Sequence, residues 1–354
     1  MTEQEREQTP AELLASWQKD PRLAPYGGSN FGMPLDLLLE DKGLIVPTAR
    51  FFLRANGPVP TIDPTTWRLR VSGHVARELT ISLSDLQSLP SRTLTAFLEC
   101  AGNSRTRYSP PAEGTPWRND AAGNATWKGV NLAAVLDLAG VGVDAVDVVC
   151  QGGDFDGMRR GLPITVARAA ETLLVWRMNG ANLPAAHGGP VRLLVPGWAG
   201  IASTKWLVGL EVLDHAFAGF WNADNYVVWT EHGEAVRPIQ EMPVKSIIAA
   251  PADGAILAPG PRLLIGYAWS GHGAIRRVEV SADGGRTWGE AALRTAGRRS
   301  WVRFEYPWHA TVGQIRLRAR ATDERGLTQP TIATWNAKGY QMNAIHEVVV
   351  TVTT

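Results

Sequence analysis

Hydrophobic and polar positions along this chain of 354 residues follow two patterns, the period of a helix and the alternation of a strand. Thr9-Pro-Ala-Glu12 combines a capping hydroxyl, a proline at the first helical position and a glutamate at the third, which predicts a short N-terminal helix. Residues 67–71 alternate apolar and basic side chains as a half-buried strand does, whereas residues 131–140 have the period of a helix that ends at glycine. Strand and helix signals therefore remain mixed to about residue 240.

After Ile239 the pattern changes to proline-rich spacers, short strands and turns. Residues 275–288 predict a hairpin, residues 315–321 alternate with a period of two, and residues 346–352 supply a last strand. The three arginines on one face of 315–321 favour a solvated outer face over a phosphate-binding ribbon. We expect an α+β protein with two domains: residues 1–240, which include an N-terminal arm, and an all-β sandwich of residues 241–354.

Composition excludes several classes of protein. Apolar residues make up 45% of the chain and charged residues 19%, which indicates a globular protein with a sizeable core. The net charge of +1 gives no field for gathering polyanions, so nucleic acid is not expected as a partner. No apolar run reaches the roughly 18 residues of a membrane span. No export signal is visible at the start, so we expect a cytoplasmic protein, or a periplasmic one if a signal has been removed.

The two cysteines have different settings. Cys150 closes an apolar run and is expected to be an inert, buried thiol. Cys100 ends the run 94–99 and begins Cys100-Ala-Gly-Asn-Ser-Arg105, a strand-to-turn transition that can present a thiol. A nearby arginine favours the thiolate, the form that binds metals or attacks electrophiles. The residues alone leave three readings open: nucleophile, metal ligand and inert thiol.

Cys100-Ala-Gly-Asn-Ser-Arg105 resembles the cysteine segment of the sulfite oxidase family of molybdenum enzymes, in which that thiolate binds molybdenum held by molybdopterin. Further family-like segments follow in the same order: Phe51-Phe-Leu-Arg-Ala-Asn-Gly-Pro-Val-Pro60, Asp154 after Cys150-Gln-Gly-Gly, His187-Gly-Gly-Pro-Val-Arg192 and Pro196-Gly-Trp-Ala-Gly-Ile-Ala-Ser-Thr-Lys-Trp206. Gly266-Tyr-Ala-Trp-Ser-Gly271, Asp283-Gly-Gly-Arg-Thr-Trp288 and Trp335-Asn-Ala-Lys-Gly339 resemble the family's immunoglobulin-like dimerisation domain. The resemblance implies a mixed α/β molybdopterin domain, then an all-β immunoglobulin-like sandwich, in a homodimer.

The resemblance also implies a molybdenum–molybdopterin cofactor with Cys100 as the metal ligand. A pterin needs polar partners at its edges and cations for its phosphate. Asp154 and His187 match the first role, whereas Arg192, Ser203, Thr204 and Lys205 match the second. The remaining residues implied in cofactor binding are Phe52, Leu53, Arg54, Ala55 and Asn56.

The reaction implied is oxidation of sulfite to sulfate by oxygen-atom transfer. Planar guanidinium groups bind small oxyanions through paired hydrogen bonds, and Arg54 and Arg105 match the family's positions for this task. Tyr226 matches the active-site tyrosine, and Trp117 and Arg303 are matched to the substrate pocket. The predicted catalytic residues are Cys100, Arg54, Arg105 and Tyr226.

The chain departs from the family pattern in two places. Ala55-Asn56 stands where Asn-His is usual, which removes an imidazole, and Ser104-Arg105 is closer to some bacterial relatives, including sulfane dehydrogenase subunits, than to the animal enzymes. The chain has no haem-binding motif, so we expect an external electron acceptor, with a cytochrome c as the expected partner. The alternatives are a relative that acts on a sulfane sulfur carrier, nitrate or a sulfoxide, and a non-catalytic assembly protein.

Overall fold

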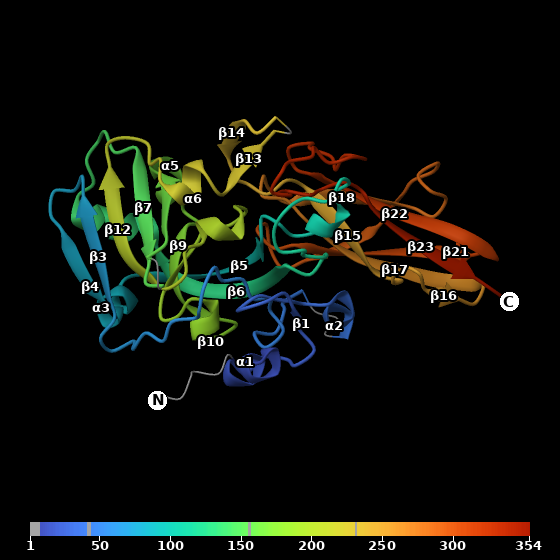
Figure 1. The fold of residues 1–354 in the computed structure, drawn as a ribbon, viewed down its shortest axis with the longest axis horizontal. Coiled ribbons are helices and arrows are strands. Elements are labelled where there is room, and N and C mark those ends of the chain that lie inside the picture. Colours follow the sequence, from blue (N-terminus) through green and yellow to red (C-terminus); the bar gives the residue numbers. More distant parts are fainter. Residues whose placement is uncertain (1–7, 41–43, 155–156, 231) are drawn as a thin grey trace, which may run out of the picture.

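The computed structural model describes residues 8–40, 44–154, 157–230 and 232–354, and most of its elements are strands (Figure 1). The N-terminal arm is formed by α1 (Pro10–Ser16), β1 (Ala24–Pro25), β2 (Phe31–Gly32) and α2 (Leu35–Glu40). The Thr9 hydroxyl accepts a hydrogen bond from the Glu12 N–H at 3.3 Å, and the Glu12 carboxylate accepts one from the Thr9 N–H at 2.8 Å. The predicted capping box is therefore confirmed.

The first sheet of the N-terminal half carries the cysteine segment. Its strands are ordered β10-β9-β6-β5, and β11 also pairs with β9. The strands are β5 (Ser91–Glu99), β6 (Ala122–Asn131), β9 (Leu173–Met178), β10 (Ala181–Asn182) and β11 (Arg192–Leu194). Because β5 ends at Glu99, the next residue, Cys100, begins a turn at the end of the sheet.

The second sheet has the order β4-β3-β12-β7-β8. Its strands are β3 (Arg68–Gly73), β4 (Leu79–Ser82), β7 (Asp147–Gly152), β8 (Arg159–Pro163) and β12 (Leu207–Leu213), accompanied by α3 (Leu83–Ser88), α4 (Leu132–Ala139) and α5 (Ile164–Ala167). Asn131 caps α4, and Gly140 ends it with a left-handed φ of 69°, as the sequence pattern predicted. Cys150 on β7 is 1% exposed, and burial raises the pKa of its thiol to about 12, which agrees with an inert role.

The C-terminal half is a sandwich of two sheets, and the hairpin and last strand predicted from the sequence are confirmed. One sheet has the order β15-β17-β21-β20 and the other β16-β23-β22-β18-β19. The strands are β15 (Lys245–Ala250), β16 (Ile256–Leu257), β17 (Gly260–Trp269), β18 (Ile275–Ser281), β19 (Gly289–Glu290), β20 (Ala292–Thr295), β21 (Val302–Ala310), β22 (Gly313–Asp323) and β23 (His346–Val352). Before the sandwich come α6 (Phe220–Ala223), β13 (Val227–Trp229) and β14 (Ala235–Pro238), so the predicted boundary at residue 240 falls between β14 and β15.

The two halves share one hydrophobic core. Trp269 and Trp301 of the sandwich pack in the same cluster as Trp117 and Trp127 of the N-terminal half. These four side chains are all fully buried, which accounts for part of the high tryptophan content of 14 residues. The α+β class and the order of a mixed domain followed by a β-sandwich are thus as predicted, with β structure dominant.

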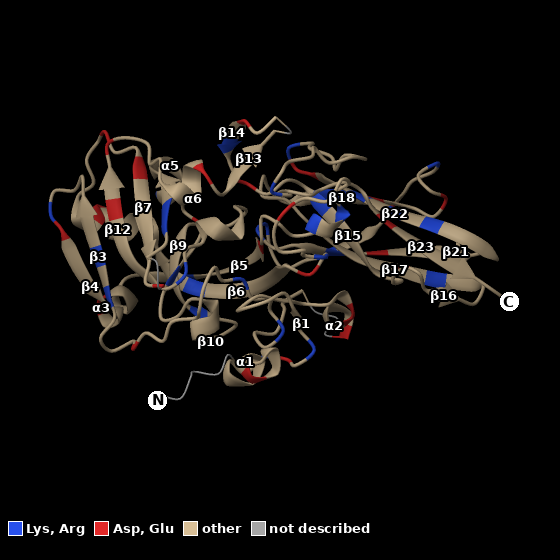
Figure 2. Cartoon of the chain, in the orientation of Figure 1, with Lys and Arg blue, Asp and Glu red and all other residues tan. Residues whose placement is uncertain are grey.

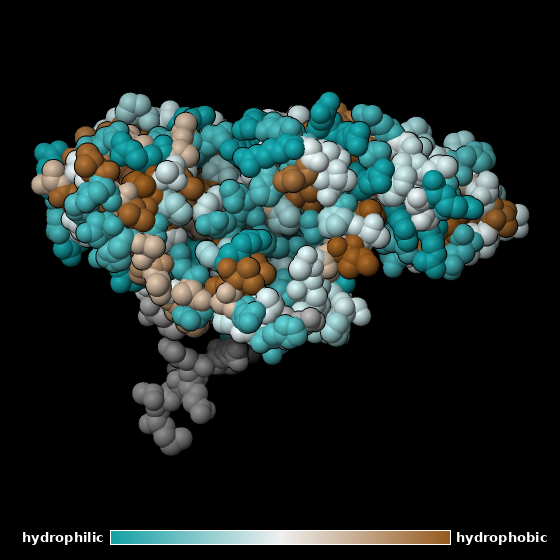
Figure 3. All heavy atoms as spheres, turned by 90° about the horizontal axis from the view of Figure 1, so that it is seen from above, coloured by the Kyte–Doolittle hydropathy of each residue, from teal (hydrophilic) through white to brown (hydrophobic). Residues whose placement is uncertain are grey.

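Charged residues of both signs are spread over both halves of the chain (Figure 2). On the face in Figure 3, hydrophobic side chains form small patches separated by hydrophilic ones. The arginines of β22 contact acids on neighbouring strands: Arg316 and Arg318 pair with Glu347, and Arg320 pairs with Glu279. This agrees with the solvated outer face predicted there. None of the helices in the described ranges is long and apolar enough to cross a membrane.

Candidate functional site

Cys100 lies in a tight turn that several backbone hydrogen bonds hold. Its N–H donates to the Ala121 carbonyl at 2.9 Å, and its carbonyl accepts from the Asn103 N–H at 2.9 Å. Ser104 has a left-handed backbone with φ of 69°, and its N–H donates to the Arg118 carbonyl at 2.7 Å. The turn therefore fixes Cys100 relative to the arginine that follows in the short 3-10 helix η1 (Arg105–Arg107).

The residue before Cys100 is tied to the sandwich. Glu99 is fully buried, and its carboxylate accepts hydrogen bonds from the Lys245 ammonium at 2.9 Å and from the Trp269 indole at 2.7 Å. The Lys245 ammonium also donates to the Asn103 carbonyl at 3.2 Å. A buried ion pair between the halves thus helps to hold the cysteine turn in place.

Cys100 lies between two pockets. The inner pocket leaves about 790 Å³ free of protein atoms, counting solvent at its mouth, and the outer pocket leaves about 630 Å³ on the same measure. Arg54, Cys100 and Tyr226 line both. A group bound at the Cys100 sulfur would therefore be reachable from either side.

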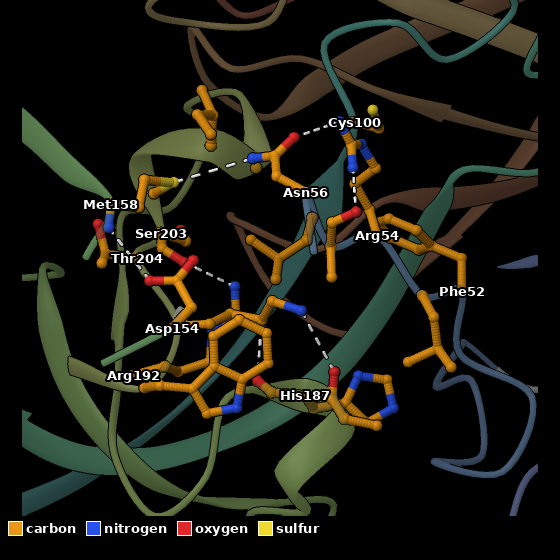
Figure 4. A pocket seen from close by; sticks show the side chains of 18 of the residues that line it. Phe52, Arg54, Asn56, Cys100, Asp154, Met158, His187, Arg192, Ser203 and Thr204 are labelled. Atoms are coloured by element: carbon orange, nitrogen blue, oxygen red, sulfur yellow. Dashed lines mark hydrogen bonds between the residues drawn. The ribbon is translucent and has the colours of Figure 1, made fainter. Parts of the chain in front are cut away.

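The inner pocket gathers all the predicted cofactor-binding residues (Figure 4). Its lining includes Phe52, Leu53, Arg54, Ala55, Asn56, Cys100, Asp154, His187, Arg192, Ser203, Thr204 and Lys205. They come from the loop after the N-terminal arm, the end of β5, the loop after β7, the 3-10 helix η2 (Ala185–His187), β11 and the segment after the 3-10 helix η3 (Gly200–Ala202). Segments far apart in the sequence thus converge on one cavity.

The inner pocket has an excess of cations. Arg192 is buried and donates to the carbonyls of His187 at 2.9 Å and Ser203 at 2.8 Å, and burial lowers its pKa to about 9. Burial, together with the charges of Arg192 and Arg54, holds the pKa of Lys205 well below its ordinary value, although Asp154 opposes this shift. Asp154 is the only acid among the described residues of the lining. An anionic group in the pocket would relieve this repulsion.

The donor set fits a molybdopterin. The Thr204 hydroxyl is buried and has no hydrogen-bond partner among the described residues, although a buried polar group normally has one. It lies in the lining beside the Lys205 cation, where a phosphate oxygen would satisfy both. Cys100 supplies a sulfur for the metal, and Asp154 a carboxylate for the donors of a pterin ring. The residues present therefore match a group with a metal at one end and a phosphate at the other.

His187 is neutral in this setting. Burial, followed by the charges of Lys19, Lys205 and Arg192, holds the pKa of its imidazole well below the ordinary value. Its Nε2 lies 3.0 Å from the Lys19 ammonium, so that edge of the ring contacts the protein. The polar role predicted for His187 toward the pterin therefore does not involve Nε2.

Arg105 is held in the outer pocket within a cradle of three glycines. Its Nε donates to the Lys338 carbonyl at 2.9 Å and its Nη1 to the Thr115 carbonyl at 2.5 Å. A Cβ added at Gly102 would lie 2.3 Å from the guanidinium, one at Gly114 3.1 Å from it, and one at Gly339 2.7 Å from the Arg105 side chain. A side chain at Gly102 or Gly339 would therefore force Arg105 to shift, and one at Gly114 would require a shift of a few tenths of an ångström.

Tyr226 and Arg54 complete the shared wall. Tyr226 stacks on Tyr340 with ring centroids 5.2 Å apart, and burial raises the pKa of its hydroxyl, so the hydroxyl is neutral near pH 7. Arg54 donates to the Asn56 side-chain carbonyl at 2.5 Å and to that of Asn30 at 3.2 Å. The asparagine that departs from the family pattern thus contacts the arginine predicted to bind substrate.

Arg303 is not part of the site. It lies on β21 opposite Tyr267 of β17, its guanidinium pairs with Glu305, and it is absent from the described lining of both pockets. Its neighbours Val302 and Phe304 face the sandwich core, so strand alternation directs Arg303 to the other face of the sheet. The prediction of a pocket arginine here was wrong.

The additional cation of the outer pocket is Lys338, which the sequence reasoning missed. Its ammonium lies 3.3 Å from the Glu113 carboxylate, and both residues line the pocket with Trp117, Arg105 and Tyr340. Lys338 falls within Trp335-Asn-Ala-Lys-Gly339, a segment matched to the family for its fold and not for a site. The sequence therefore contained a signal for Lys338, but only the folded chain brings this residue close to the cysteine turn.

Comparisons with known proteins agree with this geometry. The family described as oxidoreductase molybdopterin binding domain matches residues 56–221, and the Mo-co oxidoreductase dimerisation domain family matches residues 236–353. Mitochondrial sulfite oxidase of Mus musculus is 40% identical to the chain, and the match covers 90% of the chain and 63% of that protein. Sulfite oxidase of Arabidopsis thaliana is 31% identical over 86% of the chain and 88% of its own length.

A solved structure shares the whole fold. The sulfane dehydrogenase SoxCD of Paracoccus pantotrophus superposes with a TM-score of 0.84 at 27% identity, and the match covers the whole of this chain and 95% of that one. The chain spans somewhat less than two thirds of the length of the mouse relative.

Proposed function

Because the chain belongs to the sulfite oxidase family of molybdopterin-dependent oxidoreductases, we propose that its substrate is sulfite, which it oxidises to sulfate. The cofactor of this family is the molybdenum cofactor, and the chain carries both the cofactor-binding and the dimerisation domain. The single observation that carries the proposal is the position of Cys100 between the inner pocket and a cationic outer pocket.

Each pocket would have its own task. The inner pocket would hold the cofactor, with Cys100 as the protein ligand of the metal, Arg192 and Lys205 near the phosphate and Asp154 near the pterin. When bound, the cofactor supplies the two-electron chemistry that transfers an oxygen atom to the substrate. The outer pocket would bind the substrate anion.

The outer-pocket residues bind and orient the anion. Arg54 and Arg105 present guanidinium groups that form charge-assisted hydrogen bonds with oxyanions. Arg105 enters this role with its Nε and Nη1 already fixed by carbonyls, so little conformational entropy is lost on binding. The neutral Tyr226 hydroxyl has a hydrogen bond with the Arg54 guanidinium, which donates, so its own hydrogen can be donated to an anion between the pockets. Trp117, which is fully buried, supplies an apolar part of the outer-pocket wall.

A second candidate is oxidation of sulfane sulfur on a carrier. The likeness to SoxCD over the whole chain favours it, as does Ser104-Arg105 after the cysteine segment. A carrier-bound sulfur and sulfite differ in size and charge. Sulfite is a small oxyanion, and the two guanidinium groups favour it over an uncharged substrate.

A donor panel tests the proposal. Molybdenum-loaded protein is incubated with ferricyanide or cytochrome c and with sulfite, a sulfane sulfur compound or no donor, and nitrate and sulfoxide are tested separately as oxidants. We expect sulfite to give the highest kcat/KM and stoichiometric sulfate. Faster turnover of the sulfane compound would transfer the assignment to the second candidate, and molybdenum-loaded protein without any turnover would favour the non-catalytic alternative.

We also propose that the protein is a homodimer and that its acceptor is an external redox protein such as a cytochrome c. The match of residues 236–353 to a dimerisation domain supports the first statement. Light scattering of the purified chain tests whether it is a homodimer. Cytochrome c reduction in the donor panel tests the proposed acceptor.

A further inference from the structure

Lys19 is a buried cation that belongs to neither matched domain. It follows α1 in the N-terminal arm, before the cofactor-domain match begins at residue 56. Lys19 is only 7% exposed. Its backbone N–H donates to the Leu14 carbonyl at 2.8 Å, and this bond closes the end of the helix. The arm thus turns inward at this point and places an ammonium group behind the inner pocket.

The Lys19 side-chain nitrogen has three polar partners, one for each of the hydrogens that an ammonium carries. It donates to the carbonyl of Phe51 at 2.7 Å and to the carbonyl of Thr48, and it lies 3.0 Å from His187 Nε2. The imidazole also has a hydrogen bond with the Thr48 backbone, so Lys19 and His187 meet at the same stretch of chain before the Phe51 loop. Lys19 therefore fixes the orientation of an imidazole in the pocket wall.

The same contacts hold the loop that forms another part of the wall. Phe51 lines the pocket and packs edge-on against His187, with ring centroids 5.5 Å apart and planes at 89°. The residues that follow, from Phe52 to Asn56, also line the pocket. One ammonium thus joins two walls of the inner pocket that are far apart in the sequence.

This arrangement costs stability on its own. A buried cation whose partners are two carbonyls and a neutral imidazole loses hydration without gaining a counter-charge, and burial lowers the pKa of Lys19 to about 7. An apolar side chain would fill the same space without that cost, so packing alone does not account for a lysine here.

We propose that Lys19 is a positioning residue of the cofactor pocket, which holds neutral His187 and the Phe51 loop in the arrangement that binds molybdopterin. The inference rests on the assignment of the inner pocket to the cofactor, but not on the identity of the substrate. It gives the N-terminal arm, which neither family match covers, a part in cofactor retention.

The test compares cofactor retention and thermal stability in wild type and Lys19→Met. Met keeps the apolar stem and removes all three donors. Pterin content after extensive dialysis is measured by fluorescence, and the unfolding temperature is measured for cofactor-free and cofactor-loaded protein. A ligand that binds only the folded state stabilises it by an amount that grows with the logarithm of the affinity, so the gap in unfolding temperature between the two forms reports binding.

We expect Lys19→Met to weaken molybdopterin retention by about 10- to 100-fold, the range by which metal affinity falls when a residue that orients a metal-bound histidine is removed. The gap in unfolding temperature should narrow accordingly. Leu14→Ala is the control, because it removes a buried side chain of the same arm and should lower both unfolding temperatures alike. In a His187→Ala background, Lys19→Met should have a much smaller effect on retention.

The inference is overturned if Lys19→Met lowers both unfolding temperatures equally and keeps the wild-type pterin content. Lys19→Gln, which retains an amide donor, serves for the same comparison if the methionine variant does not accumulate. Wild-type protein that retains pterin but does not oxidise sulfite would contradict the proposed substrate and leave this inference intact.

Discussion

Gly339→Ala should displace Arg105, the arginine proposed to bind the substrate, without removing any of its polar atoms. The new Cβ would lie 2.7 Å from Arg105 Cγ and 2.7 Å from the Ala112 Cβ, so it would overlap both neighbours. Ordinary van der Waals contact begins near 3.4 Å, so relief requires a shift of several tenths of an ångström. The guanidinium is tied to two carbonyls at 2.9 and 2.5 Å, and a shift of this size misaligns those bonds.

The expected loss follows from that displacement. A catalytic or binding group misplaced by about 1 Å can cost about 100-fold in rate, so we expect kcat/KM for sulfite to fall by about 10- to 100-fold. Gly339 also has a left-handed φ of +58°, where a side chain costs roughly 1 to 2 kcal/mol in stability. Stability and kinetics must therefore be separated.

Gly254→Ala is the matched control for this prediction. Gly254 also has a left-handed φ, of +75°, and no heavy atom lies within 4 Å of its added Cβ. We expect the control to lose a similar amount of stability in urea denaturation while keeping wild-type sulfite kinetics. Equal kcat/KM for the two variants at matched molybdenum content would refute the claim that the glycine at 339 is needed to position Arg105 for substrate.

Three further predictions concern the rim of the site, a corrected residue and acid stability. Glu113→Gln removes the carboxylate that pairs with Lys338, so KM for sulfite should fall about two- to fivefold, and the effect should fade at high salt; an unchanged KM at low salt would contradict it. Arg303→Gln should leave sulfite kcat/KM within about twofold, because Arg303 lines neither pocket. Partly buried His346, with its pKa lowered from 6.5 to about 3 chiefly by desolvation, takes up its proton mainly in the unfolded chain, so stability should fall from pH 6.5 toward 3 by up to about 4 to 5 kcal/mol. Urea denaturation across this pH range should give a flatter profile for His346→Asn, and identical profiles would exclude the histidine as the cause.

Local chemistry made much of the fold predictable. The capping box at Thr9 and the glycine stop at residue 140 depend on side chains within a few residues, so the sequence pattern alone locates α1 and α4. The strand β23 has the bounds that its sequence indicated. Motif order then predicted the lining of the inner pocket, because the family-like segments of the N-terminal half contribute residues to it.

Residues joined only by tertiary contacts were not predictable in this way. Lys338 reaches the outer pocket because Arg105 Nε donates to its carbonyl across 233 positions of sequence. Lys19 reaches His187 across 168 positions, and no local pattern marks a lysine for burial. Arg303 failed for another reason: its match to a pocket arginine was loose, and in the strand its side chain lies on the sheet face opposite to Val302 and Phe304, where it pairs with Glu305.

The most direct test of the central claim is sulfite-dependent reduction of ferricyanide by molybdenum-loaded wild type and Cys100→Ser, with molybdenum and pterin measured in the same samples. The account predicts that wild type contains molybdenum and pterin in equal amounts and oxidises sulfite, whereas Cys100→Ser folds, keeps pterin and does not turn over. Wild-type rates in Cys100→Ser, or wild-type protein free of molybdenum and pterin from a molybdenum-replete host, would contradict it.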